Sequence, residues 1–192
     1  MTDLSTKHAI RRAALSRRDL VDPNEAHAAA RAVASRGLSL VADLAGAAAT
    51  VGAYWPIRSE LSTRPLLEAL ARADYRTALP VMTAVAKPLV FRRWSPGDDL
   101  EVGALGLAEP LPDAPHLVPE ILFVPLAAFD ARGHRIGYGG GNFDATIAAL
   151  RSKGPLVAVG LAYEAQEVAR IPEEPHDALL DYVVTEERLI KP

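Results

Sequence analysis

Apolar residues follow two patterns that alternate along this chain. Short apolar runs bounded by proline, glycine or polar residues are typical of buried strands, and we expect strands at residues 50–55, 76–81, 88–94, 121–125, 156–163 and 183–185. Apolar spacings of three and four, or helix-forming composition, predict helices at residues 3–20, 23–36, 38–44, 64–74 and 145–150. Gly37 is expected to end the first part of the second helix. Strands that alternate with helices predict an α/β sandwich around a largely parallel sheet.

Length and composition indicate one globular unit. The chain has 192 residues, of which 49% are hydrophobic and 23% charged, so we expect a single domain over residues 1–192. The proline-rich residues 109–119 are too few for a domain linker, and we interpret them as a surface connection.

Charge and residue usage exclude several function classes. A net charge of −3 argues against binding to nucleic acid or to acidic membranes. The chain has no cysteine, which excludes disulfides, thiolate nucleophiles and cysteine metal sites. No run approaches the roughly 18 apolar residues that cross a bilayer, and the first 20 residues lack the apolar block of a signal peptide. We therefore expect a cytoplasmic protein.

A glycine-rich run offers the clearest chemistry. Four of the five residues 137–141 are glycine, after the predicted strand at 121–125 and before the predicted helix at 145–150. Such a loop allows several backbone N–H groups to converge on one anion, and the helix start adds a positive dipole end. Asp144 is positioned where a carboxylate could hold Mg²⁺ against a phosphate. The alternative is a simple tight turn, because neither the Walker spacing nor the dinucleotide fingerprint is present.

Two further groups are candidates for binding a charged or polar ligand. Lys7 and Arg11 are four residues apart, so on a helix they share a face and could clasp a polyphosphate; a solvated basic face is the alternative. Glu60 follows the predicted strand at 50–55, where open α/β sheets bind ligands. It could otherwise cap the helix that follows.

The remaining candidates are aromatic and acidic. Residues 91–94 combine Phe91 and Trp94 with two arginines and could stack on a flat heterocycle, although Trp94 could instead pack over the sheet edge. His176 and Asp177 begin a late acidic group, a feature that is usually only solvated.

Taken in order, these pieces resemble the 5-formyltetrahydrofolate cyclo-ligase family, also called 5,10-methenyltetrahydrofolate synthetases. The similar segments are residues 7–11, 54–60, 79–80, 91–94, 106–110, 124–125, 129–130, 133, 135, 137–144, 166, 172, 176–177 and 185–186. The resemblance implies a three-layer α/β/α sandwich similar to those of sugar-phosphate isomerases and CoA transferases. It also implies that ATP and Mg²⁺ drive the conversion of 5-formyltetrahydrofolate to 5,10-methenyltetrahydrofolate, ADP and phosphate. In that reaction the formyl oxygen is phosphorylated, and N10 then closes the ring.

The resemblance also implies roles for individual residues. The predicted catalytic residues are Lys7, Arg11 and Arg135. The predicted ATP site comprises Lys7, His8, Ala9, Ile10, Arg11, Arg135, Ile136, Gly137, Tyr138, Gly139, Gly140, Gly141, Asn142 and Phe143. The predicted folate site comprises Ile57, Glu60, Trp94, Tyr138, Gly139, Gly140, Gly141 and Asn142. Asp144 and Asp177 would hold the metal. The expected partners are folate and ATP, and we expect a monomer, with a dimer as the alternative.

The chain departs from the family pattern at the proposed site. Residues 141–145 read Gly-Asn-Phe-Asp-Ala where the family usually carries Gly-Tyr-Tyr-Asp-Arg. Ser62 also stands where an acidic residue is common. These changes keep one alternative open, a paralogue that binds folate or nucleotide without turnover or with a shifted substrate. A sugar-phosphate isomerase on a related fold, which needs no ATP, is a further alternative.

Overall fold

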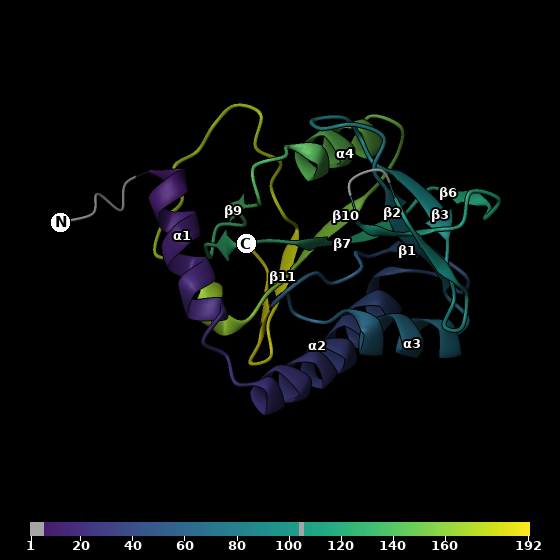
Figure 1. The fold of residues 1–192 in the computed structure, drawn as a ribbon, viewed down its shortest axis with the longest axis horizontal. Helices are drawn as coiled ribbons and strands as arrows, with labels where there is room; N and C mark the ends of the chain where they lie inside the picture. Colours follow the sequence, from purple (N-terminus) through teal and green to yellow (C-terminus); the bar gives the residue numbers. More distant parts are fainter. Residues whose placement is uncertain (1–5, 104–105) are drawn as a thin grey trace.

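A computed structural model describes residues 6–103 and 106–192, and its centre is a mostly parallel sheet (Figure 1). Five neighbouring strands are parallel, and antiparallel strands flank them on both sides. The order across the sheet is β12 (Leu189–Ile190), β11 (Tyr182–Val184), β10 (Val157–Leu161), β7 (Ile121–Pro125), β1 (Thr50–Gly52), β2 (Arg76–Val81), β3 (Val90–Arg93) and β6 (His116–Leu117). The prediction of an α/β fold with a largely parallel sheet is confirmed.

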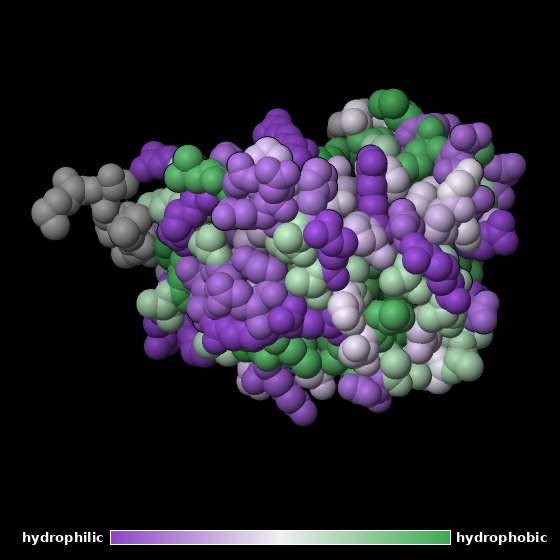
Figure 2. Space-filling view, turned by 90° about the horizontal axis from the view of Figure 1, so that it is seen from below, coloured by the Kyte–Doolittle hydropathy of each residue, from purple (hydrophilic) through white to green (hydrophobic). Residues whose placement is uncertain are grey.

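Helices cover both faces of this sheet. On one side lie α2 (Pro23–Leu44) and α3 (Arg64–Arg72), and on the other lies α4 (Asn142–Arg151) (Figure 1). Each face has its own cluster of buried side chains, with Phe123 on the α2–α3 side and Phe129 on the α4 side. Viewed from the α2–α3 side, hydrophilic and apolar residues are intermixed on the surface (Figure 2). Within residues 6–103 and 106–192, no helix has the length and apolar character needed to cross a membrane.

Smaller elements pack around the sheet. Helix α1 (Lys7–Arg18) lies beside the hairpin of β8 (Ala128–Phe129) and β9 (Arg135–Ile136) and the short helix η1 (Glu164–Gln166). The expected start of the first helix lies outside the described residues. A second hairpin joins β4 (Leu100–Val102) to β5 (Ala108–Pro110). The interpretation of residues 109–119 as a surface connection is therefore wrong in part, because β5 and β6 lie there and Glu109 is buried.

Helix α2 differs from expectation at Gly37. The helix begins as predicted, since Pro23 is at its first turn and the Asp22 carboxylate accepts a hydrogen bond from the Asn24 N–H at 2.8 Å. It then continues without a break through Gly37. A Cβ at this position would lie 3.0 Å from Leu66 Cδ1, so the glycine lets α2 and α3 approach closely instead of ending the helix.

Other boundaries shift by a few residues. Strand β1 ends at Gly52, because the chain then turns so that the Thr63 hydroxyl donates to the Tyr54 carbonyl at 2.6 Å. Helix α4 begins at Asn142, three residues before the predicted start, directly after Gly141 in a left-handed conformation. The glycine loop therefore leads into the helix with no spacer.

Candidate active site

A cavity of about 420 Å³ opens where the parallel strands end. Pro80 at the end of β2 and Pro125 at the end of β7 form its floor, as expected for ligand sites in open α/β sheets. Its walls come from α1, from residues 54–60, from the glycine loop at 137–141 with the start of α4, and from residues 174–177. The cavity therefore brings together segments from all parts of the chain.

The glycine loop presents unpaired backbone N–H groups. Gly139 and Gly141 have φ values of 95° and 68°, which residues with a Cβ rarely adopt. The N–H groups of residues 138–144 donate no hydrogen bond to any other residue that the structure describes. These donors lie at the positive end of α4 and line the cavity, so the loop is suited to hold an anion.

Helix α1 supplies two cations to the same cavity. The Lys7 ammonium lies 2.7 Å from the Asp177 carboxylate and 2.8 Å from Glu174, and Arg11 Nε donates to the Gly137 carbonyl at 2.7 Å. Burial alone would lower the pKa of Lys7, but the hydrogen bonds that its ammonium donates to Asp177 and Glu174 raise it overall. The two residues thus face the cavity and do not form the solvated basic face that was the alternative.

The three residues between them do not line the cavity. His8 is exposed, whereas Ala9 and Ile10 are buried, Ile10 against the β8–β9 hairpin. The structure does not support side-chain contacts from His8, Ala9 or Ile10 to a ligand in the cavity. Lys7 and Arg11 point into the cavity, whereas Ile10 is turned toward the β8–β9 hairpin and His8 toward solvent.

A buried ion pair joins the start of α4 to the late part of the chain. Arg135 Nη2 lies 2.8 Å from Asp144 Oδ1, and Arg135 Nη1 donates to the Ala178 carbonyl at 2.5 Å. Asp144 Oδ1 also accepts the Ala178 N–H at 3.1 Å. Burial lowers the pKa of the Arg135 guanidinium, and the neighbouring Asp144 partly offsets this. Asp144 Oδ2 has no hydrogen-bond partner among the described residues, so one oxygen of this carboxylate is available.

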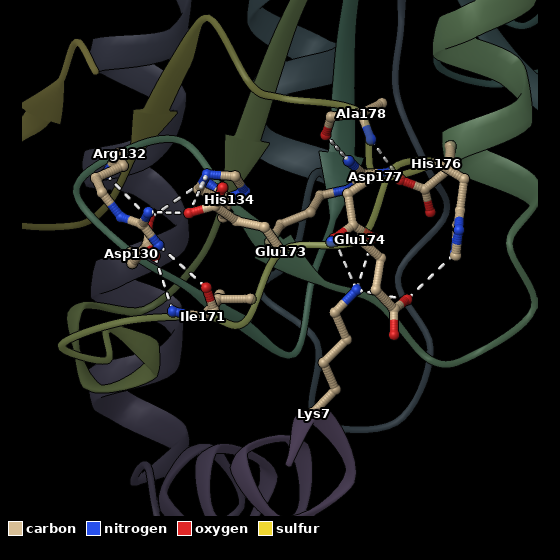
Figure 3. Close-up of polar contacts among 12 residues, drawn as sticks. Lys7, Asp130, Arg132, His134, Ile171, Glu173, Glu174, His176, Asp177 and Ala178 are labelled. Carbon is tan, nitrogen blue, oxygen red and sulfur yellow. Dashed lines mark hydrogen bonds and ion pairs between the residues drawn. The ribbon is translucent and has the colours of Figure 1, made fainter. Parts of the chain in front are cut away.

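Residues 171–178, which we call the late segment, are fixed at both ends (Figure 3). At one end, the buried Asp130 carboxylate accepts the Ile171 N–H at 2.9 Å, and Arg132 bonds both Asp130 and Glu173. At the other end, Lys7 contacts Asp177 (Figure 3), and Arg135 donates to the Ala178 carbonyl. The ligand atoms of Glu174, His176 and Asp177 lie within 4.8 Å of one another. The sequence pattern had indicated His176 and Asp177 but not Glu174.

Glu60 is part of a polar group at the other end of the cavity. Its Oε2 accepts the Ile57 N–H at 2.9 Å, and its carboxylate is hydrogen-bonded to Tyr138. Burial raises the pKa of Glu60 above its ordinary value. Glu60 does not cap α3, whose N-cap is Thr63.

Arg18, which the sequence did not indicate, supports the polar group around Glu60. Arg18 is buried on α1, donates to the Tyr138 hydroxyl, and bonds Ser59 Oγ at 3.1 Å. Its guanidinium also lies 5.6 Å from the centre of the Tyr138 ring. The only signal in the sequence was its place on the basic face of a helix, which does not distinguish it from exposed arginines.

Trp94 lies outside the cavity, contrary to expectation. Its ring is buried, packs edge-to-face on Trp55 with 5.2 Å between centroids, and donates through Nε1 to the Asp98 carbonyl at 3.1 Å. Trp55 lines the cavity in its place, together with Ile57. Trp94 is therefore a packing residue outside the cavity, because β3 is antiparallel to β2 and ends beside the start of β2, away from the carboxyl ends of the parallel strands.

Comparison with known proteins identifies the family. Residues 3–186 match the model of the 5-formyltetrahydrofolate cyclo-ligase family. The chain belongs to this family. It is 33% identical over 164 residues to the 5-formyltetrahydrofolate cyclo-ligase of Haemophilus influenzae, which covers 82% of this chain and 86% of that protein. It is 36% identical over 141 residues to the protein of the same name from Escherichia coli K12, covering 71% and 77%.

Solved structures of this cyclo-ligase family support the same assignment. The NMR structure of 5,10-methenyltetrahydrofolate synthetase from Aquifex aeolicus superposes with a TM-score of 0.74 at 28% identity, covering 96% of this chain and 92% of that one. The predicted family is thus confirmed, and its relatives are named as enzymes.

Proposed function

We propose that this protein is an ATP-dependent 5-formyltetrahydrofolate cyclo-ligase that forms 5,10-methenyltetrahydrofolate, ADP and phosphate. The observation that carries the proposal is the unpaired N–H groups of residues 138–144, which share one cavity with Lys7, Arg11 and Arg135. This cavity belongs to a member of the cyclo-ligase family.

The proposed chemistry requires positioning and charge neutralisation. The formamide oxygen of 5-formyltetrahydrofolate is a poor leaving group, so it attacks the γ-phosphorus of ATP and ADP departs. N10 then attacks the activated carbon and loses its proton to solvent, the C–O bond breaks, and phosphate leaves with that oxygen. Lys7, Arg11, Arg135 and the loop N–H groups would offset the phosphate charge. No nucleophilic side chain is needed.

The residues around the phosphate end fit Mg²⁺. This ion is usually held by one or two carboxylates together with substrate phosphates. Asp144 keeps an oxygen without a partner, and Asp177 carries its charge in the same cavity, although Lys7 now bonds both of its oxygens. Bound there, Mg²⁺ would neutralise phosphate charge.

The folate would occupy the Glu60 end of the cavity. Glu60 can accept hydrogen bonds from the N–H groups of the pterin ring, and Tyr138 and Ile57 lie beside it. Trp55 offers the aromatic surface that we had expected from Trp94. We propose that the enzyme acts as a monomer, with a dimer as the alternative.

An absorbance assay tests the proposal directly. Purified protein is mixed with 5-formyltetrahydrofolate and Mg²⁺, with and without ATP, and the methenyl band is followed. We expect ATP-dependent growth of the band, and Asp144→Asn should slow it by about 100-fold or more, because a preorganised charge in the site is lost. The exposed Asp43 gives a matched control, and Asp43→Asn should react at the wild-type rate. Turnover by Asp144→Asn at the wild-type rate would show that Asp144 does not hold the metal.

The altered loop motivates a second candidate, a paralogue that binds folate or nucleotide without turnover. Asn142 and Ala145 replace the tyrosine and arginine of the family pattern, which removes one cation from the start of α4. The same assay decides between the two. A folded protein that binds ATP but produces no methenyl band would favour this paralogue.

A further inference from the structure

The exposed segment at residues 83–88, which joins β2 to β3, has a fixed place beside the glycine loop. Its side chains are exposed, so apolar packing cannot hold it. Yet Ala86 has a φ of 56°, a left-handed conformation that is unfavourable for a residue with a Cβ. Such a conformation persists where the surroundings determine it, and it is found most often at functional sites. Polar contacts must therefore hold this segment.

Asn142 supplies two of those contacts. Its side chain is buried, and its Nδ2 donates to the Ala84 carbonyl at 2.6 Å and to the Lys87 carbonyl at 2.9 Å. The two bonds flank Ala86, the residue with the unfavourable backbone. An amide nitrogen carries two hydrogens, and both are used here. A tyrosine, which the family pattern carries at this position, has one hydroxyl donor and cannot bridge two carbonyls.

The segment in turn fixes the glycine loop. The Ala86 N–H donates to the Gly140 carbonyl at 2.9 Å. All peptide bonds in the described chain are trans, so the Gly140 carbonyl and the Gly141 N–H point in opposite directions. The bond from Ala86 therefore sets the plane of the peptide that carries the Gly141 N–H and directs this donor away from the segment. Residues 139–141 have no side chains that could do the same.

We propose that Asn142 is a positioning residue that holds residues 83–88 so that Ala86 orients the glycine loop toward a nucleotide polyphosphate. This inference rests on the proposed function, because the anion is taken to be that of ATP. Asn142 acts through the backbone of Ala86 and Gly140. Asn142, where the chain departs from the family pattern, thus places residues 83–88 at the edge of the proposed phosphate site.

The test separates the positioning role from general stability. Asn142→Ala is compared with Asn24→Ala, an exposed asparagine on α2, and Asn142→Leu repeats the test without leaving a cavity. Amide hydrogen exchange is measured for residues 82–89, and KM is measured for ATP and for 5-formyltetrahydrofolate. Loss of two hydrogen bonds should speed exchange of the Ala86 amide and raise the KM for ATP by about 5- to 30-fold. The KM for the folate should rise by less than the KM for ATP, and every value for Asn24→Ala should change by less than about twofold.

Two results would overturn the proposal. One is unchanged exchange at Ala86 in both Asn142 variants. The other is an equal rise in both KM values, which would indicate a general loss of structure. Exchange needs no turnover, so it remains informative if the wild-type protein forms no methenyl product. In that case the proposed function fails, and binding of a non-hydrolysable ATP analogue replaces KM as the measure of the phosphate site.

Discussion

Glu60 lines the end of the cavity where we propose that folate binds. Its carboxylate accepts hydrogen bonds from the Ile57 N–H and from Tyr138. Burial raises its pKa above the ordinary value of 4.5. As the pH falls through this raised pKa, the carboxylate gains a proton and can no longer accept as many hydrogen bonds from a pterin. Substrate binding should therefore weaken in mild acid, before ordinary surface carboxylates titrate.

We expect the KM for 5-formyltetrahydrofolate to rise as the pH is lowered from about 8 to about 5. Glu60→Gln should raise this KM by about tenfold at neutral pH, because one hydrogen bond to a charged group is lost. The KM of this variant should also depend less on pH. The exposed Glu187 gives a control, since Glu187→Gln should keep the wild-type profile. A Glu60→Gln profile with the wild-type slope would show that another group titrates.

Some single-residue roles could be predicted from sequence, and others required the tertiary structure. Lys7 and Arg11 could be paired because helical spacing alone places them on one face. Trp94 was assigned wrongly, because two tryptophans lie in contact and only the packing decides that Trp55 faces the cavity. Arg18 was missed for the same reason, since its burial depends on Tyr138 and Ser59, which are distant in sequence.

Among the elements, α1 links the parts of the cavity. Lys7 contacts the late segment, Arg11 bonds the glycine loop at Gly137, and Arg18 bonds both Ser59 and Tyr138. Cationic side chains on one face of α1 thus contact three walls of the cavity. A substitution near its end should affect only the wall that it contacts.

Arg18→Met tests this division of α1. The change keeps most of the side-chain volume but removes the donors to Tyr138 and Ser59, so the Glu60 end should lose its fixed geometry. We expect the KM for the folate to rise by about tenfold and the KM for ATP to rise by less, since Tyr138 also belongs to the glycine loop. Arg12→Met, on the exposed face of the same helix, is the control. A larger effect on ATP than on folate would contradict this role for Arg18.

Long elements could be predicted from sequence more accurately than short ones. β2 and β7 have the expected bounds, because continuous apolar runs identify buried strands. The short strands β4, β6, β8, β9 and β12 have two or three residues each, too few for any periodic pattern. The late segment contacts the cavity without regular structure, so its position follows from ion pairs that connect residues distant in sequence.

At the scale of the whole molecule, one sheet connects the chain from Thr50 to Ile190. Both halves of the chain contribute to it, since β7 of the second half pairs with β1 of the first, and β6 pairs with β3. We therefore expect one cooperative thermal transition, with the same midpoint by circular dichroism and by tryptophan fluorescence. ATP with Mg²⁺ should raise this midpoint, because a ligand that binds only the folded state stabilises it. Two separated transitions would contradict the prediction of a single domain.

The pairing of Lys7 with Glu174 and Asp177 has a consequence for the order in which the protein matures. The partners are separated by 167 and 170 residues, so α1 is synthesised long before the carboxylates that it contacts. While the ribosome is still adding residues, Lys7 has no late segment to bind and β11 has not joined the sheet. A nascent chain can thus form its first helices early but acquires a complete phosphate site only as translation nears its end.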